Sequence, residues 1–334
     1  MLDVKYMERA LELAQMGCGF TNPNPLVGAV IVKEGRIIGE GYHQVYGSHH
    51  AEVNAFINAT EDVSGATMYV TLEPCSHFGK TPPCANAIVE NKIKKVIIGL
   101  IDPNPLVAGK GIKILEENGI EVVTGMLEDE GKKLNEIFLK YITTKMPFCI
   151  MKTTMSLESK IASDTGDSNL VTREYGSQFR PCVASIMQDI ETVFSDKVLL
   201  NSRFKSGICS NPVSIIVDSD GEIPLDSKVL KPKSQAKIII ATTEKADKAK
   251  IKALEEKGVK VITTPLKNGG VDLMFLMKIL AERKIDSVFI EGGSQLKYSA
   301  LEQGIVDKVI NSFGEDILSQ GYIDRRHKSK CLLD

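Results

Sequence analysis

Residues 74–84 read PCSHFGKTPPC and residues 50–52 read HAE, and these two stretches decide the fold class of the first half of the chain. Cys84 opens a predicted helix and Cys75 nearly opens one, and free backbone N–H groups at a helix start favour a thiolate. Zinc prefers thiolate and imidazole ligands, and a catalytic zinc site has three protein ligands with a fourth position for water. The two stretches therefore predict a zinc site made of His50, Cys75 and Cys84.

The acidic residue of the HAE stretch points to the reaction. Glu52 lies two residues after His50 and need not contact the metal. It is therefore free to accept a proton from zinc-bound water and to deliver it to a leaving amine. Nucleobase deaminases use a glutamate that is not a ligand in this way. We expect hydrolytic deamination of a pyrimidine-like ring, with Glu52 as the catalytic residue.

Other interpretations of these residues stay open. A single cysteine is often a buried apolar thiol, and His49 or His77 would complete a structural zinc site, which normally has four protein ligands. A deaminase of nucleic acid, such as a tRNA editing protein, would share the chemistry but have a basic face and two residues between its cysteines. The eight residues between Cys75 and Cys84 and the net charge of -2 argue against that class.

Length and composition indicate a two-domain globular protein. A chain of 334 residues suits two domains, and 43% hydrophobic with 25% charged residues is ordinary for a soluble protein. The net charge of -2 predicts no general attraction to nucleic acid or to a membrane surface. No apolar run approaches the roughly 18 residues of a membrane span. Seven cysteines without a secretory signal favour a cytoplasmic location with mostly free thiols.

Helical and strand patterns alternate along both halves. In residues 1–146 we expect helices around 7–14 and at 50–59, 84–91, 111–118 and 128–141, and strands at 28–32, 37–42, 67–72, 95–100 and 121–124, with a hairpin turn at 33–36. A polar stretch ending at Pro147 marks the boundary. In residues 147–334 we expect strands at 148–154, 213–218, 236–241, 259–263 and 287–291, and helices at 246–257 and 273–283. This alternation predicts two α/β domains with helices on both faces of a sheet.

The zinc stretches, with NPNPLVG at 22–28 and DPNP at 102–105, resemble the pyrimidine deaminase half of the bifunctional riboflavin-biosynthesis deaminase–reductases. The long insert between the cysteines points to this branch of the cytidine deaminase superfamily. The resemblance implies a cytidine deaminase-like three-layer α/β/α domain over 1–146 and a dihydrofolate reductase-like α/β domain over 147–334. It also implies a substrate, 2,5-diamino-6-(5-phosphoribosylamino)pyrimidin-4(3H)-one, and assembly into a dimer or tetramer.

Several polar residues of the first half are suited to bind that substrate. Asparagine amides can contact a ring edge as donor and acceptor, and cationic side chains in the insert are placed to meet a phosphate. Asn-Pro pairs also favour turns, so the asparagines have a loop-shaping alternative. The candidate residues are Asn24, His43, His77, Lys80, Asp102 and Asn104.

For the second half, the resemblance implies NADPH-dependent reduction of the ribosyl arm of 5-amino-6-(5-phosphoribosylamino)uracil. A glycine pair after a strand lets a cofactor pyrophosphate approach backbone N–H groups, although such a pair is often only a turn. The matching cofactor positions are Lys152, Ser156, Leu170, Thr192, Asp196, Gly292 and Gly293. The matching substrate positions are Ser168, Arg180, Leu200, Arg203 and Glu291.

The second half also departs from the family pattern. Leu170 stands where relatives have tryptophan, and residues 158–160 read ESK where they have Asp-Gly-Arg or Asp-Gly-Lys. Asp189-Ile190-Glu191 replaces a glycine-rich stretch, which places acid where a cofactor phosphate would approach. An alternative is therefore a monofunctional deaminase with an inactive reductase-like domain.

Overall fold

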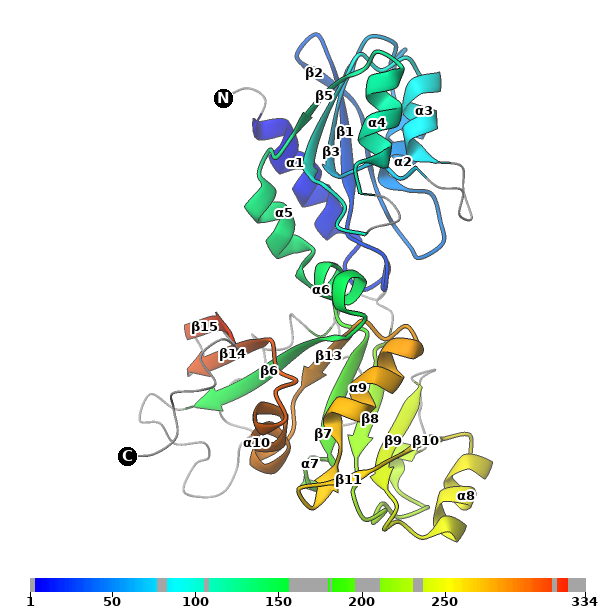
Figure 1. The fold of residues 1–334 in the computed structure, drawn as a ribbon, viewed down its shortest axis with the longest axis vertical. Helices are drawn as coiled ribbons and strands as arrows, with labels where there is room; N and C mark the ends of the chain where they lie inside the picture. Colours follow the sequence, from blue (N-terminus) through cyan, green and yellow to red (C-terminus); the bar gives the residue numbers. More distant parts are fainter. Residues whose placement is uncertain are drawn as a thin grey trace. The chain divides into compact units, whose positions relative to one another are not determined.

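The structure is a computed structural model, and it divides into two compact units, Met1–Thr144 and Lys145–Asp334 (Figure 1). It describes residues 4–76, 83–104, 108–155, 180, 182–195, 211–230, 237–313 and 317–323. Among these residues, no helix is both long and apolar enough to cross a membrane.

The first unit contains a five-stranded sheet in the order β2-β1-β3-β4-β5. β1 pairs antiparallel with β2 and β3, whereas β3, β4 and β5 run parallel. The predicted hairpin is confirmed: Glu34 and Gly35 link β1 to β2 with φ values of 51° and 76°, as a tight two-residue turn requires. The strands are β1 (Gly28–Lys33), β2 (Arg36–Tyr42), β3 (Thr67–Leu72), β4 (Lys95–Leu100) and β5 (Glu121–Thr124).

Helices cover both faces of this sheet because alternate strand residues point to opposite sides. Ala29 and Ile31 of β1 pack against α2 (Ala51–Ile57), α3 (Cys84–Glu90) and α4 (Lys110–Glu117) on one face. Val30 and Val32 pack against α1 (Val4–Gln15) on the other face. The predicted three-layer α/β/α arrangement is therefore confirmed.

The single helix predicted over 128–141 is wrong, because the structure has two helices there. α5 (Glu128–Leu134) and α6 (Glu136–Thr144) meet at Asn135. Its buried side chain accepts a hydrogen bond from Leu26 N at 2.8 Å and donates one to Leu26 O at 2.9 Å. Asn135 thereby ties the helix pair to the NPNPLVG segment, and its backbone leaves helical geometry with φ of -104° and ψ of 20°.

The second unit is built on an eight-stranded sheet in the order β10-β9-β8-β7-β13-β6-β14-β15. All neighbouring strands are parallel except β14 and β15, which are antiparallel. The strands are β6 (Phe148–Met155), β7 (Ser185–Asp189), β8 (Val213–Val217), β9 (Ile238–Thr243), β10 (Lys260–Thr264), β13 (Ser287–Ile290), β14 (Lys308–Phe313) and β15 (Ile317–Tyr322). A small hairpin, β11 (Leu266–Lys267) and β12 (Gly270–Val271), lies outside this sheet.

Buried apolar residues lie on both faces of the second sheet, as expected for parallel strands. α9 (Leu273–Glu282) and α10 (Ser294–Glu302) contribute to the core on one face, and α8 (Lys248–Glu256) contributes on the other. The short helices α7 (Ile190–Ser195) and η3 (Lys228–Leu230) complete the described elements. The second α/β sheet predicted from the sequence is thus confirmed.

Candidate active sites

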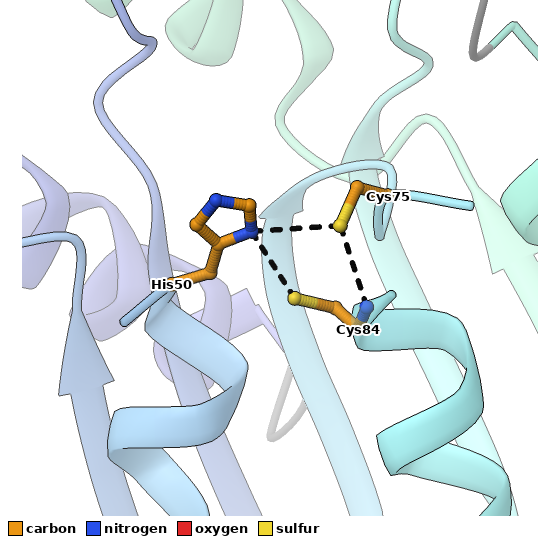
Figure 2. Close-up of side chains that lie close together, drawn as sticks. All are labelled: His50, Cys75 and Cys84. Carbon is orange, nitrogen blue, oxygen red and sulfur yellow. Dashed lines mark hydrogen bonds between the residues drawn. The ribbon is translucent and has the colours of Figure 1, made fainter. Parts of the chain in front are cut away.

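The three predicted metal ligands lie together at one end of the first sheet (Figure 2). His50 is the N-cap of α2, Cys75 follows β3, and Cys84 is the first residue of α3. His50 Nδ1 is 3.2 Å from Cys84 Sγ and 3.5 Å from Cys75 Sγ. Cys75 Sγ also accepts a hydrogen bond from the Cys84 backbone N–H at 3.3 Å.

This donor set fits a zinc ion. Tetrahedral zinc with ordinary Zn–S and Zn–N bonds places sulfur and nitrogen ligands about 3.6 Å apart, and the two measured N–S distances of 3.2 and 3.5 Å are close to that value. Cys75 and Cys84 are free cysteines rather than a disulfide. Within the described residues, no fourth His, Cys, Asp or Glu joins the cluster. The set of three matches a catalytic zinc site better than a structural one.

Hydrogen bonding within the cluster prepares one thiolate. The hydrogen bond from Cys84, together with the neighbouring His50, lowers the pKa of Cys75 to about 4. The hydrogen bond between the Cys75 and Cys84 side chains, together with burial, raises the pKa of Cys84. The hydrogen bond to the Cys75 side chain raises the pKa of His50. A thiolate next to an imidazole and a second thiol is the chemistry that a divalent cation recognises.

Glu52 lies beside the cluster in the first turn of α2. Its side chain is 3% exposed and hydrogen-bonds with Cys84. Burial raises the pKa of Glu52 to about 7, against the lowering effect of His50. A carboxyl group with a pKa near neutrality can both accept and donate a proton during one reaction.

A second polar pair borders the metal ligands. His43 is buried, and its ring lies 5.4 Å from that of His50, edge to face. Its Nδ1 contacts the His49 carbonyl at 3.0 Å and its Nε2 contacts Asn24 Nδ2 at 3.2 Å. Burial lowers the pKa of His43, so the ring is neutral and has one N–H. Because a carbonyl only accepts, Nδ1 carries that proton and Nε2 accepts from the Asn24 amide.

Asp102 and Asn104 lie in the loop that follows β4. The Asp102 carboxylate accepts a hydrogen bond from the Asn104 backbone N–H at 2.8 Å, an Asx turn that shapes the loop. Asp102 is largely buried, whereas Asn104 is partly exposed. Asp102 therefore shapes this loop, whereas the partly exposed Asn104 has the greater access to a ligand.

Glu73 organises the same loop, and it was not predicted as a site residue. Its buried carboxylate accepts from the backbone N–H groups of Asp102 and Gly109, at 3.4 and 3.0 Å, and of Gly111 and Ile112, at 3.0 and 3.4 Å. Glu73 directly precedes Pro74 and Cys75, and it thus ties the metal segment to the loop after β4 and to the start of α4. The available signal was an acid between an apolar strand and the first cysteine.

Gly111 brings α4 against the metal segment. A Cβ atom at this position would lie 2.0 Å from the Pro74 carbonyl oxygen. Only glycine permits this approach, so the path of Pro74-Cys75 depends on Gly111 as well as on Glu73.

A second charged cluster lies at the carboxyl edge of the parallel strands in the second unit. Arg180 pairs with Glu291, with Nε to Oε1 at 3.1 Å and Nη2 to Oε2 at 2.5 Å. Burial lowers the pKa of Lys152, on β6, and of Lys297, on α10. Lys297 was not predicted as a site residue, because a lysine on an amphipathic helix usually faces solvent.

Thr192, Gly292 and Gly293, three of the predicted cofactor positions, are also brought together. Asp189 joins them: its carboxylate accepts from Thr192 N at 2.7 Å and from Gly293 N at 2.5 Å. These are the kind of backbone N–H groups that a cofactor phosphate would use. As arranged here, the turn after β13 does not fit a phosphate, because a carboxylate already fills it.

The other predicted site residues lie outside the described residues. They are His77 and Lys80 of the first unit and Ser156, Ser168, Leu170, Asp196, Leu200 and Arg203 of the second.

Both units match known domain families. Residues 1–100 match the cytidine and deoxycytidylate deaminase zinc-binding region, and residues 147–314 match the RibD C-terminal domain. The fold and the metal cluster therefore define a zinc-binding deaminase domain followed by a RibD-type C-terminal domain.

Similarity to known proteins extends over nearly the whole chain. Riboflavin biosynthesis protein RibD of Actinobacillus pleuropneumoniae is 47% identical over 92% of this chain and 82% of its own length. The protein of the same name from Aquifex aeolicus is 41% identical over 96% of this chain and 89% of its own. A solved diaminohydroxyphosphoribosylaminopyrimidine deaminase/5-amino-6-(5-phosphoribosylamino)uracil reductase from Thermotoga maritima is 38% identical, with a TM-score of 0.82, and the match covers 96% and 89% of the two chains.

The chain belongs to the RibD family of riboflavin biosynthesis proteins. The resemblance drawn from the zinc stretches and the long cysteine insert is thereby confirmed.

Proposed function

We propose that the two activities of this enzyme family are divided between the two units, with deamination by residues 1–146 and reduction by residues 147–334. The chain is an enzyme of riboflavin biosynthesis with a deaminase domain and a reductase domain. The proposed first substrate is 2,5-diamino-6-(5-phosphoribosylamino)pyrimidin-4(3H)-one. The proposed second substrate is the uracil that its deamination gives.

In the first unit, His50, Cys75 and Cys84 would hold zinc. When bound, zinc supplies a Lewis acid that makes water acidic enough to be a nucleophile near neutral pH. Glu52 accepts the proton of the attacking water and passes it to the amine nitrogen, which leaves as ammonia. Burial supports this role, because a carboxyl group with a pKa of about 7 exchanges protons readily at neutral pH.

Asn24 and His43 would orient the pyrimidine ring. Because His43 holds the Asn24 Nδ2 group, the Asn24 Oδ1 atom is left to accept a hydrogen bond from an amino or ring N–H group. Asn104 is proposed to contact the substrate from the loop that Asp102 and Glu73 shape. His77 and Lys80 stay predictions as ligands of the phosphate.

One observation carries the deaminase proposal: a three-ligand cluster of zinc-type donors with a buried glutamate beside it. The test is ammonia release from the diaminopyrimidine phosphate by the purified chain. Dialysis against a chelator should stop the release and zinc should restore it. Release that is unchanged after the metal is removed would contradict the proposal.

In the second unit, Lys152, Arg180 and Glu291 are proposed to border the substrate and the dinucleotide, with NADPH as the reductant. As arranged, the turn at Gly292-Gly293 does not fit a cofactor phosphate, because the Asp189 carboxylate fills it. The test is reduction of the phosphoribosylaminouracil with NADPH, and the loss of absorbance at the reduced nicotinamide band measures its rate. The dimeric or tetrameric assembly and the cytoplasmic location stay predictions.

A further inference from the structure

Asp189 lies where a parallel sheet usually binds its ligand. It is the last residue of β7, and β7 pairs with β13, whose chain continues into Glu291, Gly292 and Gly293. Ligands of parallel α/β sheets bind outside the carboxyl ends of the strands. Asp189 therefore points a negative charge into the expected dinucleotide site.

Both carboxylate oxygens of Asp189 are engaged by backbone N–H groups from two separate segments. Oδ1 accepts from Thr192, three residues along the chain, and Oδ2 accepts from Gly293, 104 residues away. A Cβ atom on Gly292 would lie 2.7 Å from Asp189 Oδ2, so the carboxylate occupies the space directly over the glycine pair. This is the space that an anion needs to reach the N–H groups.

The surroundings are nevertheless those of an anion site. Lys152 and Lys297 are both partly buried. Burial lowers the pKa of Lys297, and the nearby charge of Lys152 lowers it further. Among the described residues, the charges of Asp189 and Glu291 act on Lys297 in the opposite direction. α10 begins just after Gly293 without a side-chain cap. Two ammonium groups and an uncapped helix start would favour a phosphate if the carboxylate were absent.

We propose that Asp189 is an internal competitor for the cofactor phosphate, because it occupies the N–H groups of Thr192 and Gly293 and so weakens dinucleotide binding by the second unit. The inference rests on the proposed reductase function and deepens it. A bound dinucleotide has to displace the carboxylate from Gly293 or bind beside a like charge, and either event lowers affinity.

A purely structural role for Asp189 is the competing explanation. Aspartate often caps a helix, and Asp189 accepts from Thr192 near the start of α7. Asp247 provides a matched comparison, since it caps α8 in the same unit and accepts from Ala249 N at 3.0 Å. Only Asp189 also reaches the glycine turn, so the two roles separate in a pair of variants.

The experiment measures NADPH binding to the full chain by titration of nicotinamide fluorescence. Asp189→Gly removes the charge and the bulk, whereas Asp189→Asn keeps the bulk and removes the charge. We expect the Kd of Asp189→Gly to fall by at least about tenfold and that of Asp189→Asn to fall less. Asp247→Gly should bind like the unaltered chain. Thermal unfolding of each variant checks that the second unit is folded, and ammonia release checks that the first unit is unaffected.

Equal Kd values for the unaltered chain and both Asp189 variants would overturn the competitor role and leave the reductase proposal standing. Weaker binding by both Asp189 variants would also overturn it, and would make Asp189 a support of the site. If no variant binds NADPH while all release ammonia, the competitor role and the proposed NADPH-dependent reduction are both wrong. If Asp189→Gly fails to fold, Asp189→Asn decides the outcome.

Discussion

Burial determines what the key side chains can do. Glu52 gains a pKa of about 7 because it is enclosed at the start of α2. His43 is kept neutral by the same effect with the opposite sign, since burial disfavours the charged form of either group. One physical cause, burial, thus gives Glu52 the pKa that its proposed role as proton carrier needs and keeps His43 neutral for its proposed role in orienting the ring.

The buried charge of Lys297 leads to a prediction about stability. Burial and the charge of Lys152 hold the pKa of Lys297 below its usual value of 10.5. The folded state therefore loses this proton before the unfolded state does. Below the folded-state pKa, the charge on Lys297 lowers the free energy of unfolding by its full amount. This cost disappears as the pH rises to the pKa of the unfolded state.

We expect Lys297→Met to raise the free energy of unfolding at pH 7.5 and to lose this advantage near pH 10.5. Denaturant unfolding of the full chain at the two pH values measures the difference. Lys278→Met, an exposed position on α9, is the control and should change little at either pH. An advantage that grows with pH would show that the charge of Lys297 is not the cause.

At the scale of elements, the end of β3 holds the deaminase site together. Glu73 directs its carboxylate to four backbone N–H groups between Asp102 and Ile112, while Gly111 lets α4 contact Pro74. The metal segment and the loop after β4 are therefore held by one side chain and one close approach.

Replacement of Glu73 by Gln should loosen both the metal segment and the loop after β4. One amide N–H₂ group would face backbone donors that now meet an oxygen, which costs about 1–3 kcal/mol of stability. We also expect a higher KM for the pyrimidine, because Asn104 loses its fixed loop. Glu116→Gln, on the exposed side of α4, is the control. Steady-state kinetics and denaturant unfolding test this, and a variant with unchanged stability and KM would refute it.

Gly111→Ala addresses the metal segment directly. The added methyl group would lie 2.0 Å from the Pro74 carbonyl oxygen, so Pro74-Cys75 has to move. We expect zinc affinity to fall by about 10–100-fold, as for other changes that displace a ligand. Gly131→Ala on α5, where the nearest contact is an ordinary 3.7 Å, should leave zinc affinity unchanged. Competition with a chromogenic chelator measures both, and equal affinities would contradict the expectation.

Elements with a clear period or a clear turn could be predicted from the sequence. All five strands of the first sheet and the Glu34-Gly35 turn were predicted, because apolar runs and turn residues are local signals. β7 was not predicted, since Ser185 and Gln188 interrupt its apolar pattern. Ser185 is tolerated in the buried strand because its hydroxyl donates to the Ser287 carbonyl at 2.8 Å.

The reach of local sequence signals also decides which site residues could be predicted. His50, Glu52, Cys75 and Cys84 lie in two short motifs and could be identified together. The roles of Glu73 and Asp189 could not, because their partners lie 29–39 and up to 104 residues away. Sequence placed an acid near the expected cofactor phosphate, but only the fold shows which N–H groups it occupies.

At the scale of the whole molecule, two separate cores carry two separate sites. The metal cluster draws all its described ligands from the first unit, and the Asp189 cluster draws on strands of the second sheet. Among the described residues, the metal cluster and the Asp189 cluster therefore share no residue and no core.

Removal of zinc should separate the two activities. A chelator is expected to abolish ammonia release and to leave the reduction of supplied phosphoribosylaminouracil within about twofold, because the second sheet keeps its own core. Parallel assays of both substrates before and after chelation, with zinc added back, make the measurement. Loss of both activities on chelation would argue against this division.

Glu52 is the residue on which the proposed deamination depends most directly. In Glu52→Gln the carboxyl group is replaced by an amide of the same shape that cannot carry the proton. Ammonia release from the diaminopyrimidine phosphate should fall by about 10²–10⁴-fold, while zinc, measured by elemental analysis of the same sample, stays at about one ion per chain. A variant that keeps its zinc and its rate of ammonia release would show that Glu52 is not the proton carrier.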